Sequence, residues 1–245
     1  MRINLINAIF ISTKEIDKIS SSILHQINII THIAAGSLAL LTGLIAILAK
    51  KGGKVHANSG KIFLCLLLVV ITTGLIGVLV FGRNTFLLVI TMLTAYLGFS
   101  GYRALKAKSN RLKALDVFAA IITLVSVLYF IYYFRSIGMI WSPVIIYSTV
   151  GYLFFVISYD FIRYLIPPTI YGNLWLYEHI LKMISAFSGI LSAFTGTVFP
   201  QYQPYSQFLP SVIGTFTSIS FMIYTYKKRV KPLKSKPIYN GQTSL

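Results

Sequence analysis

Residues 29–81 read IITHIAAGSLALLTGLIAILA at 29–49, KKGGKVHANSGK at 50–61 and IFLCLLLVVITTGLIGVLVF at 62–81. The first apolar run has 21 residues and the second has 20, and neither contains Asp, Glu, Lys or Arg. Because a helix rises about 1.5 Å per residue, each run is long enough to cross a hydrocarbon layer of about 30 Å. This stretch therefore predicts a transmembrane hairpin whose basic loop lies in water.

The composition of the whole chain supports the same class. Of the 245 residues, 56% are hydrophobic and 11% are charged, whereas soluble domains carry about 25% charged residues. The formal net charge is +17, but the basic residues lie in short loops and one tail between apolar runs. This distribution indicates the lipid bilayer as the partner and no nucleic acid.

Five further apolar runs follow the hairpin, so that the predicted fold is all-α, a polytopic bundle of seven transmembrane helices. The seven runs cover residues 29–49, 62–81, 85–102, 114–134, 141–165, 174–199 and 208–226. With seven crossings, 17 of the 22 Lys and Arg residues fall on one side of the membrane. Because basic residues near helix ends mark the cytoplasmic side, we expect the N-terminus outside and the C-terminus in the cytoplasm.

Two polar segments flank the predicted transmembrane domain of residues 29–226. Residues 1–28 are expected to be an extramembrane segment, with Lys14, Glu15, Asp17 and Lys18 suited to a helix at the membrane surface. Residues 227–245 are expected to be a basic cytoplasmic tail that attracts anionic lipid.

Small residues at four-residue spacing predict where helices pack closely, and they favour the first and sixth runs as the central ones. These residues are Gly36 and Gly43 in the first run and Ser185, Gly189 and Ala193 in the sixth. Gly60 lies four residues after His56, as Gly36 does after His32. A glycine on the same helix face leaves room beside an imidazole for a flat cofactor or another helix.

The predicted topology brings several ionisable residues to the cytoplasmic ends of their helices. The candidate ligand or cofactor-binding residues are His56, Asp160, Glu178 and His179 there, and His32 at the opposite end. Ionisable residues inside or beside membrane spans are costly and tend to be functional. An alternative for the carboxylates is ordinary pairing within one helix, Asp160 with Arg163 and Glu178 with Lys182.

Two groups of residues carry a resemblance to a known family. They are His32-x3-Gly36, Lys51-Gly52 and His56-x3-Gly60-x2-Phe63 in the hairpin, and Trp175-x3-His179-x3-Met183 in the sixth run. Over about residues 29–225 the chain resembles the bacterial predicted membrane proteins grouped as domain of unknown function 2306. The resemblance implies a protein of the bacterial inner membrane and no particular activity. Many members have a bulky or basic residue where this chain has Ala57.

Three functions remain open from the sequence. The first is a small polar His/carboxylate site at the cytoplasmic face that binds a small ligand or couples proton movement. The second is a b-type haem redox protein with His56 and His179, or His32 and an unidentified partner, as axial ligands. The third is a metal-dependent membrane hydrolase, with His56, His179 and Asp160 holding zinc and Glu178 as base. No phosphate-binding loop, H-E-x-x-H motif or nucleophile elbow occurs in the sequence.

Overall fold

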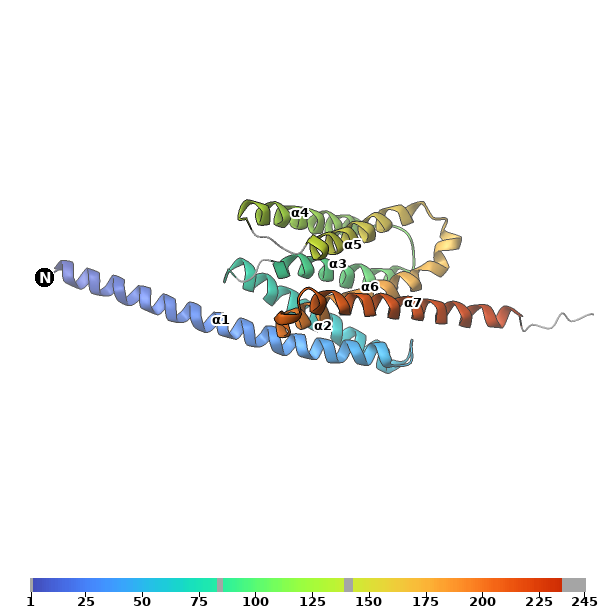
Figure 1. Ribbon diagram of the computed structural model, residues 1–245, viewed down its shortest axis with the longest axis horizontal. Helices are drawn as coiled ribbons and strands as arrows, with labels where there is room; N and C mark the ends of the chain where they lie inside the picture. Colours follow the sequence, from blue (N-terminus) through green and yellow to red (C-terminus); the bar gives the residue numbers. More distant parts are fainter. Residues whose placement is uncertain (1, 83–85, 139–142, 235–245) are drawn as a thin grey trace, which may run out of the picture.

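The computed structural model describes residues 2–82, 86–138 and 143–234, and within these ranges the chain is helical with short turns and no strand (Figure 1). Its elements are α1 (Arg2–Leu48), α2 (Lys54–Leu79), α3 (Phe86–Ala107), α4 (Ala114–Ser136), α5 (Pro143–Ile162), η1 (Arg163–Leu165), α6 (Pro168–Val198), η2 (Pro200–Tyr202) and α7 (Tyr205–Lys234). The all-α prediction is confirmed.

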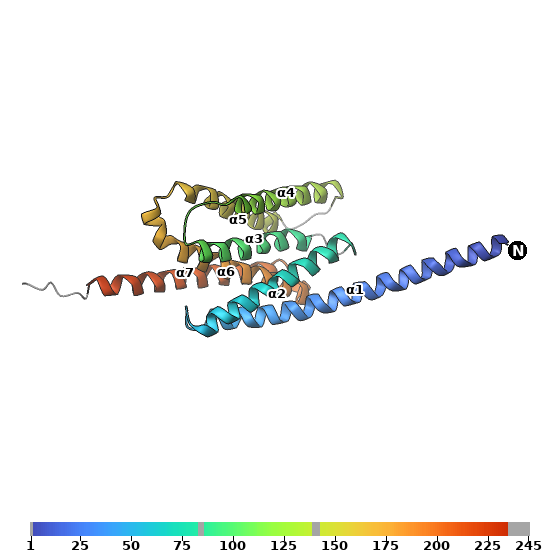
Figure 2. The ribbon, with the colours of Figure 1, turned by 180° about the vertical axis from the view of Figure 1, so that it is seen from behind.

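Successive long helices run in opposite directions through one bundle (Figures 1 and 2). Six helices within the described ranges are long and apolar enough to cross a membrane, so the chain is a multi-pass membrane protein by length and composition. α5 has 20 residues with Asp160 as the one charged residue among them. We call the end that carries loops 49–53, 108–113 and 163–167 the basic end; it lies to the right in Figure 1.

α1 continues without a break through residues 2–28, which therefore form no separate element. The sequence explains this continuity, because the first 35 residues contain neither Gly nor Pro. The candidate membrane span of α1, Ser20–Leu48, covers the predicted run of residues 29–49 except for its last residue. The helix extends well beyond the bundle (Figure 1). That the polar part lies outside the membrane stays a prediction.

Several helices extend past the apolar runs that predicted them. α2 begins at Lys54 rather than at residue 62, so that His56 belongs to the helix, and α7 continues to Lys234. α6 begins at Pro168, where proline fits the first helical turn because its missing N–H has no partner to lose. Hydropathy marks the part of a helix that fits hydrocarbon and not the residues at which its hydrogen bonds end. The predicted tail is thus helical up to residue 234, and residues 235–245 lie outside the described residues.

α3 and α6 form the centre of the bundle, with 56% and 44% of their spanning windows buried against 22% for α1. α6 was expected to be central, whereas the placement of α1 there was wrong. α1 packs mainly on α2, while α6 packs on both α3 and α7. A Cβ atom at Gly43 would lie 2.6 Å from the Phe187 ring, and one at Gly189 would collide with Thr94. A Cβ atom at Gly36 would make only an ordinary van der Waals contact, and one at Gly60 would meet open space.

Candidate functional site

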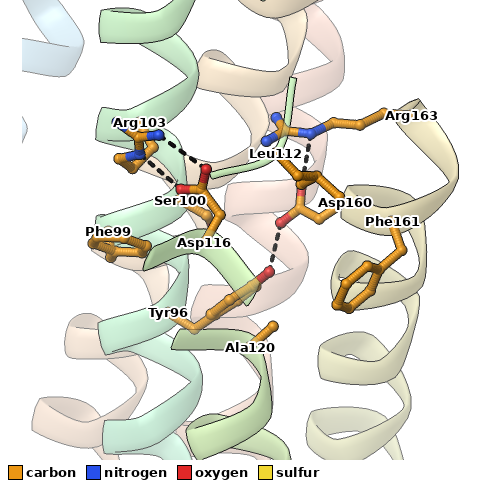
Figure 3. Close-up of a pocket in the computed structure, with 10 residues that line it drawn as sticks. All are labelled: Tyr96, Phe99, Ser100, Arg103, Leu112, Asp116, Ala120, Asp160, Phe161 and Arg163. Atoms are coloured by element: carbon orange, nitrogen blue, oxygen red, sulfur yellow. Dashed lines mark hydrogen bonds and ion pairs between the residues drawn. The ribbon is translucent and has the colours of Figure 1, made fainter. Parts of the chain in front are cut away.

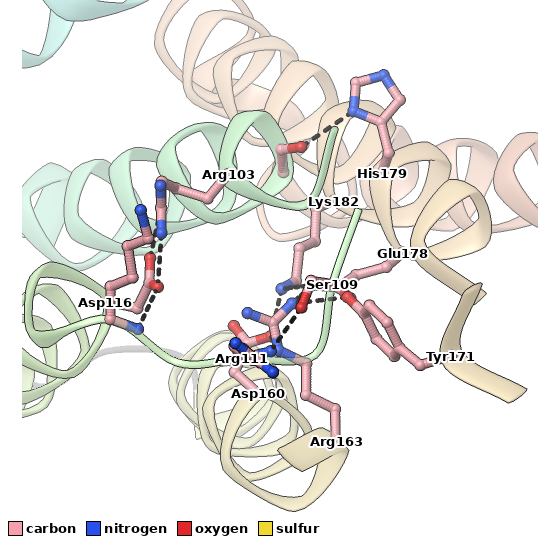
Figure 4. A network of polar contacts seen from close by, with 12 residues as sticks. Arg103, Ser109, Arg111, Asp116, Asp160, Arg163, Tyr171, Glu178, His179 and Lys182 are labelled. Carbon is pink, nitrogen blue, oxygen red and sulfur yellow. Dashed lines mark hydrogen bonds and ion pairs between the residues drawn. The ribbon is translucent and has the colours of Figure 1, made fainter. Parts of the chain in front are cut away.

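Four charged side chains form a cluster near the basic end of the bundle, and each of these residues is at most 4% exposed. They are Asp160 at the end of α5, Arg163 in η1, and Glu178 and Lys182 on α6 (Figure 4). We call these four residues the charge cluster. Two carboxylates and two cations give the cluster no net charge, which is the condition under which buried charges are tolerated.

The ammonium group of Lys182 lies between both carboxylates. Its Nζ donates to Oε1 of Glu178 at 2.6 Å and also to Oδ1 of Asp160. The second carboxylate oxygen of Asp160, Oδ2, accepts a hydrogen bond of 2.7 Å from the Tyr96 hydroxyl of α3 (Figure 3). One cation therefore joins two acids that come from different helices.

Arg163 completes the cluster from the side of η1. Its Nη1 donates to Glu178 Oε1 and, at 3.1 Å, to the Tyr171 hydroxyl oxygen, while its Nε lies 3.7 Å from Asp160 Oδ1. The Tyr171 hydroxyl donates to Glu178 Oε2 at 2.6 Å. Each acid thus contacts both cations and one tyrosine.

The surroundings of Tyr171 keep its hydroxyl protonated. Tyr171 lies in the first turn of α6, before the apolar span that begins at Leu174. Burial and the hydrogen bond to Glu178 raise the pKa of the Tyr171 hydroxyl above its ordinary value, although the nearby Arg163 charge opposes this shift. Tyr171 consequently remains a neutral donor to Glu178 over the physiological pH range.

A small cavity connects the charge cluster with a second ion pair (Figure 3). Its volume of about 10 Å³ is room for about one water molecule. Asp160 lines one side and Asp116 the other. The buried Ser100 hydroxyl also lines the cavity and has no hydrogen-bond partner within the described residues. Arg103 binds Asp116 with two hydrogen bonds of 2.7 and 2.9 Å. The cavity is therefore polar enough to hold water between two carboxylates.

The two histidines of the basic end lie outside the charge cluster. On α6, His179 follows Glu178 directly and its ring turns away from the cluster toward α3 (Figure 4), where Nδ1 contacts the Gly101 carbonyl oxygen at 3.0 Å. On α2, Nδ1 of His56 contacts the Ala46 carbonyl oxygen of α1 at 2.8 Å. Because a carbonyl only accepts, both Nδ1 atoms carry a proton, and in the neutral form of each ring the lone pair is on Nε2.

His32 has a different environment, between α1 and α2 at the opposite end of the hairpin. Its Nδ1 lies 2.8 Å from the Thr73 hydroxyl oxygen. That hydroxyl lies 2.7 Å from the Val69 carbonyl oxygen, to which it donates, and is therefore left as the acceptor for His32. Asn28 adds a bond of 3.1 Å to the Thr73 carbonyl oxygen. These contacts join two helices, and they bring no second histidine to His32.

The three-ligand zinc set predicted from the sequence, His56, His179 and Asp160, is not assembled. Asp160 instead pairs with Lys182 and accepts a hydrogen bond from Tyr96. A buried carboxylate is tolerated when cations beside it balance its charge. Within the described ranges, no group of three or more His, Cys, Asp or Glu side chains is placed to hold a metal ion. The geometry therefore gives no support to the metal-dependent hydrolase.

Sequence reasoning missed the two tyrosines of the site. Neither Tyr96 nor Tyr171 has a charged neighbour in sequence that marks it as a hydrogen-bond donor. The available signal was Lys182 within the sixth apolar run, because a lysine inside a span needs acidic partners.

Comparison with known proteins adds no relative: no family model, curated protein or solved structure matches this chain.

Proposed function

We propose that this chain is a proton-coupling protein of a bacterial inner membrane, with its centre at the ammonium group that Asp160 and Glu178 share. The observation that carries the proposal is the position of Lys182 Nζ, bonded to both carboxylates at once. When a proton neutralises one acid, the ammonium keeps the other acid as its partner. Proton binding and release then require only a short movement of one flexible side chain.

The cavity supports the proposal because it offers the proton a route. It borders both Asp160 and Asp116, and the Ser100 hydroxyl also lines it. A water molecule with two to four polar partners is stable in such a site. We propose that protons pass between Asp160 and the cytoplasm through this cavity.

Orientation is part of the proposal: seven crossings with α5 included, the N-terminus outside, and the basic end in the cytoplasm. The alternating helix directions and the loops at the basic end support it. The basic residues from Lys227 onward would then meet the anionic lipids of the inner leaflet. Membership of the family grouped as domain of unknown function 2306, which the sequence resembles, is also part of the proposal.

Reporter fusions test the orientation. A fluorescent protein that matures only in the cytoplasm is expected to be fluorescent after Leu245 and dark when inserted after Gly138. Alkaline phosphatase, which needs an oxidising compartment, is expected to give the opposite pattern at the same two positions. The same reporter active at both positions, or the reverse pattern, would contradict seven crossings with a cytoplasmic C-terminus.

Infrared difference spectroscopy tests the proton coupling. The chain contains only five Asp and Glu residues, so carboxyl bands are readily assigned. In lipid bilayers, a change from acid to neutral pH is expected to remove a protonated-carboxyl band that Asp160→Asn or Glu178→Gln abolishes. Asp116→Asn, across the cavity, should preserve this band and slow the deuterium exchange of its proton. If no band of a buried carboxyl changes with pH in the unmodified protein, the charge cluster is only structural and the proposal fails.

A further inference from the structure

We propose that His56 and His179 form a two-imidazole coordination site for a transition-metal centre, either a free ion or the iron of a haem. The inference goes beyond the proposed proton coupling and does not depend on it, because neither histidine bonds to the charge cluster. It is carried by the tautomers of the two rings, by their position at the same end of the bundle, and by the open space beside them.

Both imidazoles are prepared for ligation in the same way. Metal-binding histidines nearly always donate their second ring N–H to a carbonyl or carboxylate, which fixes the tautomer and the ring orientation. Here the Ala46 carbonyl of α1 holds His56 at 2.8 Å, and the Gly101 carbonyl of α3 holds His179 at 3.0 Å. In the neutral form of each ring the lone pair is on Nε2, and this is the form in which imidazole binds a metal.

The starts of α2 and α6 bring the two histidines to the same end of the bundle. Both helices start at the basic end and run in the same direction (Figures 1 and 2). Two turns after His56 on α2 comes Phe63, and just over two turns after His179 on α6 comes Phe187, and these two rings lie 6.4 Å apart. The Phe63–Phe187 contact thus joins α2 and α6 about two turns beyond the two histidines.

The space beside the pair is open on the α2 side. Gly60 lies one helical turn after His56, and a Cβ atom added there would have no neighbour within 4 Å. The Phe63 and Phe187 rings and the uncrowded backbone at Gly60 suit a flat apolar ligand.

The size of the ligand set favours haem over a free ion. Zinc requires about four protein ligands or three with an open position, whereas the described residues offer no third His, Cys, Asp or Glu at this place. A haem brings four nitrogens of its own and needs only two axial imidazoles. Two histidines therefore complete the coordination of haem iron but not that of a free ion.

Titration of the full-length protein in detergent with haemin, and separately with Co²⁺, tests the site. Haemin is expected to give the six-coordinate, low-spin spectrum of two axial imidazoles. Either His56→Ala or His179→Ala should weaken haemin binding by more than about tenfold, since even outer-shell changes reach that size. A Co²⁺ complex that depends on both histidines, with no low-spin haemin complex, would instead assign the site to a free ion.

His25→Ala is the matched control, because it removes an imidazole at the far end of the hairpin, where its ring contacts that of Phe81 in a tilted arrangement with centroids 4.5 Å apart. Its haemin spectrum should equal that of the unmodified protein. The spectrum of the unmodified protein tests the haem assignment even if a histidine variant does not fold, because a five-coordinate, high-spin haemin complex overturns it. Failure of both probes to bind, or binding that survives in both His→Ala variants, overturns the site.

Discussion

Replacing Lys182 with Met is expected to destabilise the protein by about 3–5 kcal/mol, the usual result of removing one partner from a buried ion pair. The substitution preserves the length of the side chain and removes the ammonium that contacts both Asp160 and Glu178. Arg163 alone then faces two carboxylates, each in a residue that is 4% exposed. Loss of the folded protein from the monodisperse peak in gel filtration, and a lower melting temperature, measure the effect.

A second substitution that restores the charge balance should recover most of the loss. In Lys182→Met with Glu178→Gln, Asp160 and Arg163 remain as one neutral pair, whose Arg163 Nε and Asp160 Oδ1 lie 3.7 Å apart in the unmodified protein. Lys106→Met is the control for the side-chain change itself, since Lys106 is exposed and should tolerate it. A single variant as stable as the unmodified protein, or a double variant no better than the single one, would show that charge balance does not hold the cluster together.

The recovered double variant also separates stability from function. It is expected to fold but to lack both the shared ammonium and the Glu178 carboxylate, so that its infrared spectrum should lose the pH-dependent carboxyl band, as that of Glu178→Gln alone does. A folded double variant that kept this band would assign proton exchange to Asp160 alone, with no part for Lys182.

Part of the charge cluster could be predicted from the sequence. Spacing predicted Asp160 beside Arg163 and Glu178 beside Lys182, each within one helix, and the second of these pairs has an Nζ–Oε1 distance of 2.6 Å. Spacing could not predict the ion pairs between different elements, in which Lys182 also binds Asp160 and Arg163 also binds Glu178. These contacts depend on how α5, η1 and α6 pack, which is a property of the whole bundle.

The histidines show the same division. Charge distribution in the loops and helix direction were enough to predict that His56 and His179 lie at one end of the bundle. The carbonyl groups that hold their rings come from α1 and α3, the helices packed beside α2 and α6. Because every backbone carries carbonyls, no residue type in the sequence identifies Ala46 or Gly101 as the acceptor.

Gly101→Val is expected to weaken both the α3–α6 contact and the proposed histidine site. A Cβ atom at Gly101 would lie 3.0 Å from Cβ of Lys182 and 3.1 Å from Sδ of Met183, both on α6. Since the Lys182 Cβ belongs to the stiff start of its side chain, α6 must move away from α3. Overpacking of this kind costs about 1–3 kcal/mol, which should lower the melting temperature measurably.

Movement of α3 also displaces the carbonyl that orients His179, because the acceptor belongs to Gly101 itself. Haemin or Co²⁺ binding should therefore weaken by about 10- to 100-fold, as for other losses of an outer-shell partner. Gly151→Val in α5 is the matched control: its Cβ meets no atom within 4 Å, and valine is a better helix former than glycine. Unchanged probe affinity in a Gly101→Val protein that melts earlier would show that the carbonyl does not orient the imidazole. An unchanged melting temperature would show that α3 and α6 are not in close contact at Gly101.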